Sequence, residues 1–190
     1  MSVLIGYATE HGSTRSVAER IAGHLDAPGR HVELLPFDRV PAAAVHEALV
    51  IGSAVHQGAW LPDAVRFVRD HHTVLAARPV WMFSVGMTAA LRGPARRLAS
   101  RSEQPKIEAL RRQLSPRDYH CFSGVIRPEH LDRTGRIVFR LLGCRYGDFR
   151  DWSEVDAWAA RIAQDLPAAS ADSDRPAKRP AGEHGSDTTP

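Results

Sequence analysis

The sequence predicts a doubly wound α/β domain, with a five-stranded parallel sheet in the order 2-1-3-4-5 and helices on both of its faces. Two observations favour this fold class. Short apolar runs alternate along the chain with longer segments whose apolar residues recur at helical spacing. Several of these runs are apolar throughout, which is typical of parallel strands that are covered on both faces.

Five segments have the length and composition of strands, and the first, third and fourth are nearly continuous apolar runs. They cover residues 3–7, 31–35, 48–55, 79–86 and 119–126. The second segment alternates between polar and apolar residues, so we expect it at an edge of the sheet. The stretch from Pro36 to Pro41 then turns the chain away from that strand.

The first two helices are predicted from apolar stripes. One follows the first strand and carries Val17, Ala18, Ile21 and Leu25. The other runs from Pro62 to Leu75, where Pro62 and Asp63 supply a start. Its stripe is predicted to be Val65, Val68 and His72, with Phe67 beside it.

Two more helices are predicted in the second half of the chain. A longer helical region carries Ile107, Leu110 and Leu114, and it is broken by Gly93-Pro94 and by Pro105. The last helix begins at Asp151 or Ser153, because Asp151 and Glu154 have the spacing of a capping box. Its buried residues are predicted to be Val155, Trp158, Ala159, Ile162 and Leu166.

We expect one domain over residues 1–166. A chain of 190 residues that is 43% hydrophobic can bury one sizeable core but has little material for a second. From Pro167 onward the sequence consists largely of Ala, Ser, Asp, Pro, Gly and Lys without apolar periodicity. Residues 167–190 are therefore predicted to be a disordered tail.

The formal net charge is +3, and the predicted tail holds three basic and four acidic residues, so the predicted domain itself carries about +4. A basic domain fits an anionic ligand, a membrane surface or nucleic acid, and the charge alone does not choose among them. No recognised nucleic-acid-reading motif accompanies the charge. A nucleic-acid partner is therefore not expected.

The sequence predicts a cytoplasmic protein. No apolar stretch reaches membrane-spanning length, and the first residues lead into a strand without the charged and apolar parts of a secretory signal. Cys121 and Cys144 have no metal-ligand or redox spacing, so we expect two reduced thiols and no metal site.

Residues 9–14, which join the first strand to the first helix, are a candidate anion cradle. The free N–H groups of the first helical turn point into such a loop, and the helix dipole adds partial positive charge. Gly12 permits close approach of the backbone, and Thr9, Ser13 and Thr14 offer hydroxyl donors. The loop lacks the lysine of triphosphate loops and the glycine pattern of pyrophosphate loops, which favours a single phosphate. The alternative is an ordinary helix cap formed by Ser13 or Thr14.

Two further loops are expected beside this cradle, because the carboxyl ends of parallel strands meet at one edge and ligands bind where the strand order reverses. They follow the third and fourth strands and cover residues 53–60 and 84–88. The first of them offers backbone donors, the His56 imidazole and the Trp60 indole to a flat ring. A ligand with one phosphate and a flat ring fits this edge.

The segment Thr9-Glu10-His11-Gly12-Ser13-Thr14 resembles the phosphate loop of the flavodoxin family, T-x-[TD]-G-x-T, which binds the FMN phosphate without a lysine. His11 stands where that loop usually has a hydroxyl or an Asp. Within the family, the chain looks most like the small menaquinone-dependent protoporphyrinogen dehydrogenases. This closer likeness rests on residues 50–58, 67–68, 83–85 and 151–152 and extends over residues 1 to about 166. Between Ile126 and Trp152 the chain is shorter than those relatives, which affects the substrate more than the flavin.

The resemblance implies FMN as the cofactor, and it implies three groups of contacts. The phosphate would be held by Thr9, His11, Gly12, Ser13 and Thr14. One side of the isoalloxazine ring would be flanked by Ser53, Ala54, Val55, His56, Gly58 and Trp60. The other side would be flanked by Ser84, Val85 and Gly86. No catalytic acid or base is named.

Residues 133–145 have the composition of a basic amphipathic helix. Four arginines, Arg133, Arg136, Arg140 and Arg145, are interleaved with apolar residues at 137–139 and 141–142. Such a helix fits peripheral contact with anionic lipid, near a membrane quinone. The alternative is a surface helix that packs on the sheet and leaves its arginines in water.

The favoured interpretation is an FMN-dependent oxidoreductase that passes electrons between an organic substrate, with a porphyrinogen as one candidate, and a quinone or other acceptor. A soluble flavodoxin-type electron carrier is the second interpretation, and the basic charge counts against it because such carriers tend to be acidic. A flavin-free binding module of the same fold is the third, and the retained hydroxyl-rich loop counts against it.

Overall fold

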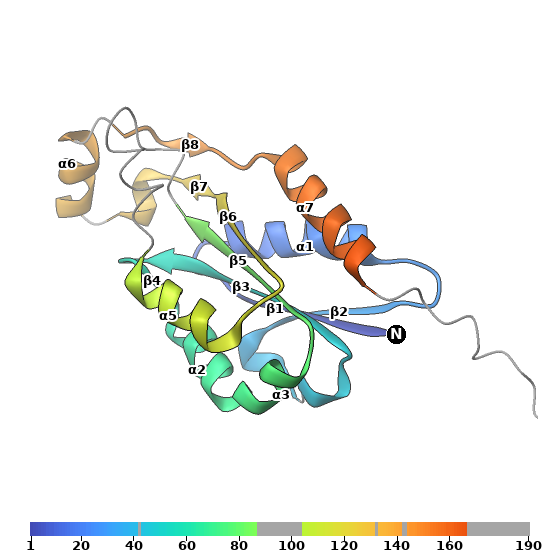
Figure 1. Ribbon diagram of the computed structural model, residues 1–190. Coiled ribbons are helices and arrows are strands. Elements are labelled where there is room, and N and C mark those ends of the chain that lie inside the picture. Colours follow the sequence, from blue (N-terminus) through green and yellow to red (C-terminus); the bar gives the residue numbers. More distant parts are fainter. Residues whose placement is uncertain (42, 87–103, 132, 142–143, 167–190) are drawn as a thin grey trace, which may run out of the picture.

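The computed structural model describes residues 1–41, 43–86, 104–131, 133–141 and 144–166. Its centre is a parallel sheet in the order β2-β1-β3-β5-β6 (Figure 1). These strands are β1 (Ser2–Ala8), β2 (His31–Pro36), β3 (Ala48–His56), β5 (Val80–Gly86) and β6 (Asp118–Ser123). The short strand β4 (Ala59–Trp60) only pairs back onto β3, so the five parallel strands have the predicted order and the predicted fold class is confirmed.

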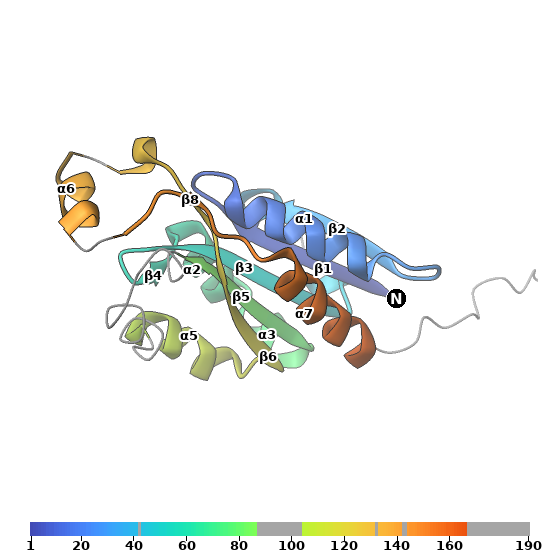
Figure 2. The same ribbon diagram turned by 90° about the horizontal axis from the view of Figure 1, so that it is seen from above.

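Helices cover both faces of the sheet (Figures 1 and 2). One face carries α1 (Ser13–Leu25) and α7 (Trp152–Asp165). The other face carries α2 (Pro62–Asp70), α3 (His72–Ala77) and α5 (Pro105–Leu114). Each face has its own apolar core, one containing Phe83 and Trp158 and the other containing Phe67 and Met82. No helix in the part of the chain that the structure describes is long and apolar enough to cross a membrane.

Gly52 lets the core pack closely against the centre of the sheet. A Cβ atom at this position of β3 would lie 2.1 Å from the ring of Phe83 on the neighbouring strand β5. That ring is fully buried and packs edge-on against Phe122 and Trp158, at centroid distances of 6.1 and 6.0 Å. The glycine therefore makes room for the aromatic group that joins β5 to α7.

The last predicted helix is confirmed. Asp151 caps α7, since its carboxylate accepts hydrogen bonds from the N–H groups of Ser153 and Glu154 at 3.0 and 3.2 Å. The Glu154 carboxylate lies 2.9 Å from Nε2 of His120 on β6, so it ties the helix to the sheet. The predicted stripe of α7 is buried.

The helix predicted over residues 62–75 is two helices. The chain bends at His71, with φ −111° and ψ 17°, so that α2 ends at Asp70 and α3 begins at His72. The predicted stripe is also partly wrong, because Val65 is 40% exposed and His72 is exposed, whereas Ala64 and Phe67 are buried. Phe67 turns this helix toward the sheet by stacking on Phe37, with ring centroids 4.4 Å apart.

The predicted fifth strand is too long. β6 ends at Ser123, and β7 (Val125–Ile126) follows it and pairs antiparallel with β8 (Gly147–Asp148). Between these short strands lie the 3₁₀ turn η4 (Pro128–His130) and the helix α6 (Arg133–Leu141). Both views show α6 beyond the carboxyl ends of the main strands, away from the other helices (Figures 1 and 2).

The remaining elements are two 3₁₀ turns between β2 and β3, η1 (Phe37–Arg39) and η2 (Ala43–Val45). Three sequence predictions lie outside the described residues: the break at Gly93-Pro94, the end of the loop at 87–88, and the tail at 167–190.

Candidate functional site

A cavity of about 680 Å³ opens at the carboxyl ends of β1, β3 and β5, where the strand order reverses. Its lining comes from residues 9–11, 13–14, 54–57, 85–86, 124–126, 130–131 and 135. The volume is within the range of small-molecule and cofactor sites, and the position is the one at which open α/β sheets bind ligands.

The loop between β1 and α1 is not an ordinary capped helix start. Gly12 is the N-cap residue, with φ +87°, and no side chain caps α1. The Gly12 N–H donates to Oγ1 of Thr9 at 3.0 Å, which closes the loop on itself. A Cβ atom at Gly12 would have no neighbour within 4 Å among the described residues, so the backbone faces open space. A cap by Ser13 or Thr14 is therefore excluded as the role of this loop.

Thr14 tests whether the residues of the loop fit an anion. Its side chain is fully buried, and its Oγ1 has no hydrogen-bond partner among the described residues. The residue nevertheless lines the cavity. Buried hydroxyls are almost always hydrogen-bonded, so an orphan hydroxyl at a helix N-terminus indicates a missing acceptor. A phosphate group supplies such an acceptor.

Ser13 connects the loop to the segment that follows β6. Its Oγ accepts a hydrogen bond from the Val125 N–H at 3.1 Å, and its own hydroxyl hydrogen remains available to donate. The preceding Gly124 fits tightly, since a Cβ there would lie 2.9 Å from Cγ1 of Val85. The walls formed by α1, β5 and β7 are thus packed against one another.

The turn after β3 forms the second wall. Ala54, Val55 and His56 line the cavity, and Gln57 and Gly58 make a two-residue hairpin turn with φ values of +47° and +75°. His56 Nδ1 lies 3.2 Å from a carboxylate oxygen of Glu10, so this wall meets the phosphate loop across the cavity mouth. Val85 and Gly86 line the cavity from the end of β5.

Three residues that the sequence assigned to the ring lie behind the cavity wall. Trp60 is 3% exposed, and its Nε1 donates to Oγ of Ser84 at 2.7 Å. Ser84 also accepts from the Tyr119 hydroxyl at 3.0 Å, and burial raises the pKa of Tyr119 to about 12. Ser53 accepts from the Leu61 N–H at 3.0 Å. The hairpin turn folds Trp60 back into the core, so its indole is not presented to a ligand.

The third wall was missed by the sequence analysis. It consists of Gly124, Val125, Ile126, His130, Leu131 and Gly135. Residues up to 126 were predicted as strand. The sequence could have placed the residues after this strand at the site, because the carboxyl ends of parallel strands meet at the same edge of the sheet. The ring of His130 stacks on that of His11, with centroids 3.9 Å apart and an interplanar angle of 8°. Burial, and secondarily the neighbouring His11, lowers the pKa of His130.

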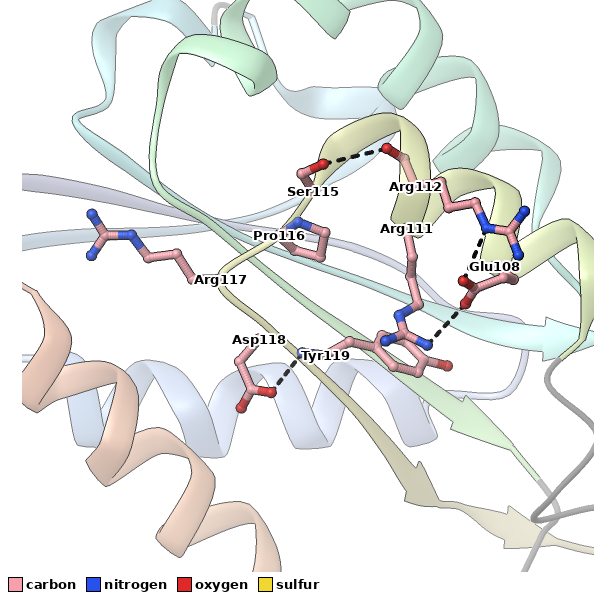
Figure 3. A pocket seen from close by; sticks show the side chains of 8 residues that line it. All are labelled: Glu108, Arg111, Arg112, Ser115, Pro116, Arg117, Asp118 and Tyr119. Carbon is pink, nitrogen blue, oxygen red and sulfur yellow. Dashed lines mark hydrogen bonds and ion pairs between the residues drawn. The ribbon is translucent and has the colours of Figure 1, made fainter.

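A second hollow, of about 320 Å³, lies at the amino end of β6 and is rich in arginine (Figure 3). Its cationic side chains do not converge. Arg111 and Arg112 both pair with Glu108, at 3.0 and 3.2 Å, while Arg117 points away from them and reaches the carbonyl of Asp165 at 3.3 Å. We therefore assign no ligand to this hollow. Within the described part of the chain, no group of three or more His, Cys, Asp or Glu residues is placed to hold a metal.

Comparison with known proteins identifies the family of this chain. Residues 4–150 match the flavodoxin domain family. Protoporphyrinogen IX dehydrogenase [quinone] of Escherichia coli K12 is 24% identical over 174 residues, which cover 86% of this chain and 95% of that protein. Two solved structures share the fold. A flavodoxin from the domain Archaea is 16% identical with a TM-score of 0.55, covering 87% of this chain and 98% of its own. Oxidised Flavodoxin 2 from Bacillus cereus is 19% identical with a TM-score of 0.55, covering 87% of this chain and 100% of its own.

The family match extends over more than half of the chain. The chain therefore belongs to the flavodoxin family, which points to FMN as its cofactor.

Proposed function

We propose that this chain is an FMN-dependent oxidoreductase that passes electrons between an organic substrate and a quinone or other acceptor. The observation that carries the proposal is the cavity of about 680 Å³ at the switch of strand order, with the buried, unpartnered hydroxyl of Thr14 in its wall. When bound, FMN supplies the redox chemistry of its flavin ring. The chain supplies binding, orientation and exclusion of water.

In this proposal the phosphate is held by the loop between β1 and α1. Thr14 donates its buried hydroxyl, Ser13 donates the hydrogen that its bond from Val125 leaves available, and Gly12 keeps the backbone open to the ligand. Thr9 contributes indirectly, because its Oγ1 already accepts from the Gly12 N–H and fixes the loop. The partial positive charge of the α1 N-terminus adds to these donors.

The flavin ring would lie between the turn after β3 and the end of β5. Ala54, Val55 and His56 present backbone and side-chain groups from one side, and Val85 and Gly86 from the other. Ser53, Trp60 and Ser84 support these walls from behind through their internal hydrogen bonds. We assign no catalytic acid or base.

The Escherichia coli relative is named for protoporphyrinogen IX and a quinone, and its 24% identity extends over 95% of its length. These two compounds are therefore the first donor and acceptor to test. The basic charge of the chain, +3, favours this enzymatic role over that of a soluble electron carrier.

We further propose that α6 brings the chain to an anionic membrane surface, where a quinone would be available. Ile137 and Leu141 lie one turn apart and are 61% and 81% exposed, and Arg133, Arg136 and Arg140 are exposed on the same short helix. Phe139, which the sequence placed at the membrane, is 5% exposed and stacks on Tyr146 at 4.7 Å. It anchors α6 to the domain and leaves Ile137 and Leu141 outside.

The test is an anaerobic titration of the FMN-loaded protein. The visible flavin spectrum should bleach on addition of protoporphyrinogen IX and return on addition of a quinone, at rates that rise with each reactant. A protein that takes up FMN but responds to neither reactant, and exchanges electrons only with redox proteins, is a carrier and contradicts the enzymatic proposal.

A further inference from the structure

The phosphate loop has an unusual charge for a site that binds an anion. Residues 9–14 include no lysine or arginine, and Glu10 adds a negative charge beside the site where a phosphate dianion would sit. Glu10 is paired with His56, and Arg15, in the first turn of α1, is paired with Glu19 at 2.8 Å. The imidazole of His11 is the one side chain within residues 9–14 that can become cationic.

A neighbouring imidazole orients the His11 ring. This ring stacks face to face on His130, and among the described residues no side chain forms a hydrogen bond or ion pair with its nitrogens. Its nitrogens therefore remain available at the cavity wall, which His11 and the orphan hydroxyl of Thr14 share. The stack restricts the orientation of an otherwise exposed side chain, and the ordering takes place before any ligand arrives.

His130 is the fixed member of the pair. The Arg127 N–H donates to its Nδ1 at 3.4 Å, and its ring also bonds to the backbone of Val125. Val125 is in turn held by Ser13, so His130 is tied to the same loop that carries His11. Burial and the nearby His11 lower the pKa of His130, while Glu129 opposes this effect and Arg127 adds to it. Two charged rings 3.9 Å apart would repel, so one ring of the pair stays neutral, and His130, the half-buried ring of the two, is the one whose pKa is lowered.

We propose that His130 is a positioning residue that holds His11 over the phosphate cradle, and that His11 takes up a proton when the phosphate of FMN binds. The proposal rests on the proposed FMN site and deepens it. A charged imidazole offsets Glu10 and gives the phosphate one charge-assisted hydrogen bond that riboflavin cannot receive. The neutral ring of His130 provides the flat surface against which the charged ring lies.

The experiment measures dissociation constants for FMN and for riboflavin between pH 6.5 and 8.5, using quenching of flavin fluorescence by the full chain. FMN affinity should fall several-fold over this range as the charge on His11 is lost. Riboflavin affinity should stay constant. Calorimetry of FMN binding in two buffers of different ionisation enthalpy should show proton uptake at pH 7.5.

Three variants separate the two roles. His11→Gln should bind FMN several times more weakly at pH 6.5 and should show no proton uptake. The pH dependence that remains in this variant records the titration of the phosphate itself near pH 6. His130→Phe keeps a flat ring without a titratable group and should retain the wild-type affinity and slope. His130→Ala removes the surface and should lose most of both. Riboflavin binding and the melting temperature should change little in all three variants.

Each outcome bears on the proposal. An undiminished slope in His11→Gln would assign the proton to another group, with His56 the nearest candidate. Wild-type behaviour in His130→Ala, or equal losses in His130→Phe and His130→Ala, would overturn the positioning role. Failure of the wild type to bind either flavin would overturn the proposed function itself. Tight binding of both flavins with equal affinity at every pH would overturn only the histidine proposal.

Discussion

Replacing Thr14 with valine should change stability and FMN affinity in opposite directions. The hydroxyl is fully buried and has no hydrogen-bond partner among the described residues, and an unsatisfied buried polar group costs about 1–3 kcal/mol. Valine has nearly the same shape and removes that group. For a domain of this size 1 kcal/mol corresponds to roughly 2–4 °C, so the flavin-free Thr14→Val protein should melt at least about 2 °C above the wild type.

The same substitution should weaken FMN binding. A hydrogen bond to a charged group contributes about 1.5–3 kcal/mol, which corresponds to roughly a ten- to hundredfold loss of affinity. Riboflavin lacks the phosphate, so its affinity should not change. Calorimetric melting of the flavin-free protein and fluorescence titration with both flavins measure the two effects.

Ser53→Ala is the matched control. Ser53 is equally buried, but its hydroxyl is used internally, accepting from the Leu61 N–H and donating to the Ala54 carbonyl at 2.8 Å. Its loss should lower the melting temperature and leave the ratio of FMN to riboflavin affinity unchanged. If Thr14→Val lowers the melting temperature and leaves that ratio unchanged, Thr14 is an ordinary core residue and the reasoning about the cradle is wrong.

FMN should displace FAD in competition, because the loop fits one phosphate and lacks the glycine pattern for a pyrophosphate; tighter binding of FAD would contradict the assignment. Gly52→Ala should destabilise the protein by about 1–3 kcal/mol or prevent folding, because its Cβ would lie 2.1 Å from Phe83; chemical denaturation measures this, and an unchanged midpoint would refute the close packing. Replacing Arg133, Arg136, Arg140 and Arg145 with glutamine should abolish salt-sensitive binding to anionic vesicles without altering FMN affinity, since each basic residue near such a surface contributes about 1 kcal/mol. The matched variant carries glutamine at four exposed arginines on other helices, Arg66, Arg69, Arg112 and Arg161, and should still bind vesicles; equal losses in both variants, or no binding by the wild type at low salt, would remove the role of α6.

The sequence predicted the sheet well because its central strands are buried on both faces. The runs at 48–55 and 79–86 have no polar face, so their composition indicates buried strands. They form β3 and β5 almost residue for residue. The Asp151 cap was readable for a similar reason, since the capping hydrogen bonds are local. Local chemistry and continuous burial therefore determined the fold class and the strand order.

The errors arose where contacts distant in sequence decide the structure. The buried face of α2 is set by Phe67, which packs on Phe37, thirty residues away in the sequence. The pairing of β7 with β8 joins residues near 125 to residues near 148, and no local pattern shows it. Phe139 has the spacing of a membrane-facing residue but is covered by Tyr146, which lies beyond the end of α6.

The candidate site also combines parts that are local in the sequence with parts that depend on distant contacts. The loop at residues 9–14 could be proposed as a cradle from the sequence because its hydroxyls lie close together along the chain. The structure places Thr9, His11, Ser13 and Thr14 in the lining of one cavity. The exclusion of Trp60 depends on the hairpin turn at Gln57 and Gly58, whose positive φ values direct the indole toward Ser84. His130 was not anticipated, because its place depends on the long-range contact between Ser13 and Val125.

A crystal structure of the chain with bound FMN would show whether the loop between β1 and α1 holds the phosphate. We expect the phosphate at the N-terminus of α1, within hydrogen-bonding distance of Thr14 Oγ1, and the flavin ring between residues 54–57 and 85–86. A flavin bound elsewhere, or one bound at this edge with its phosphate outside the loop and Thr14 still without a partner, would refute the assignment of this site.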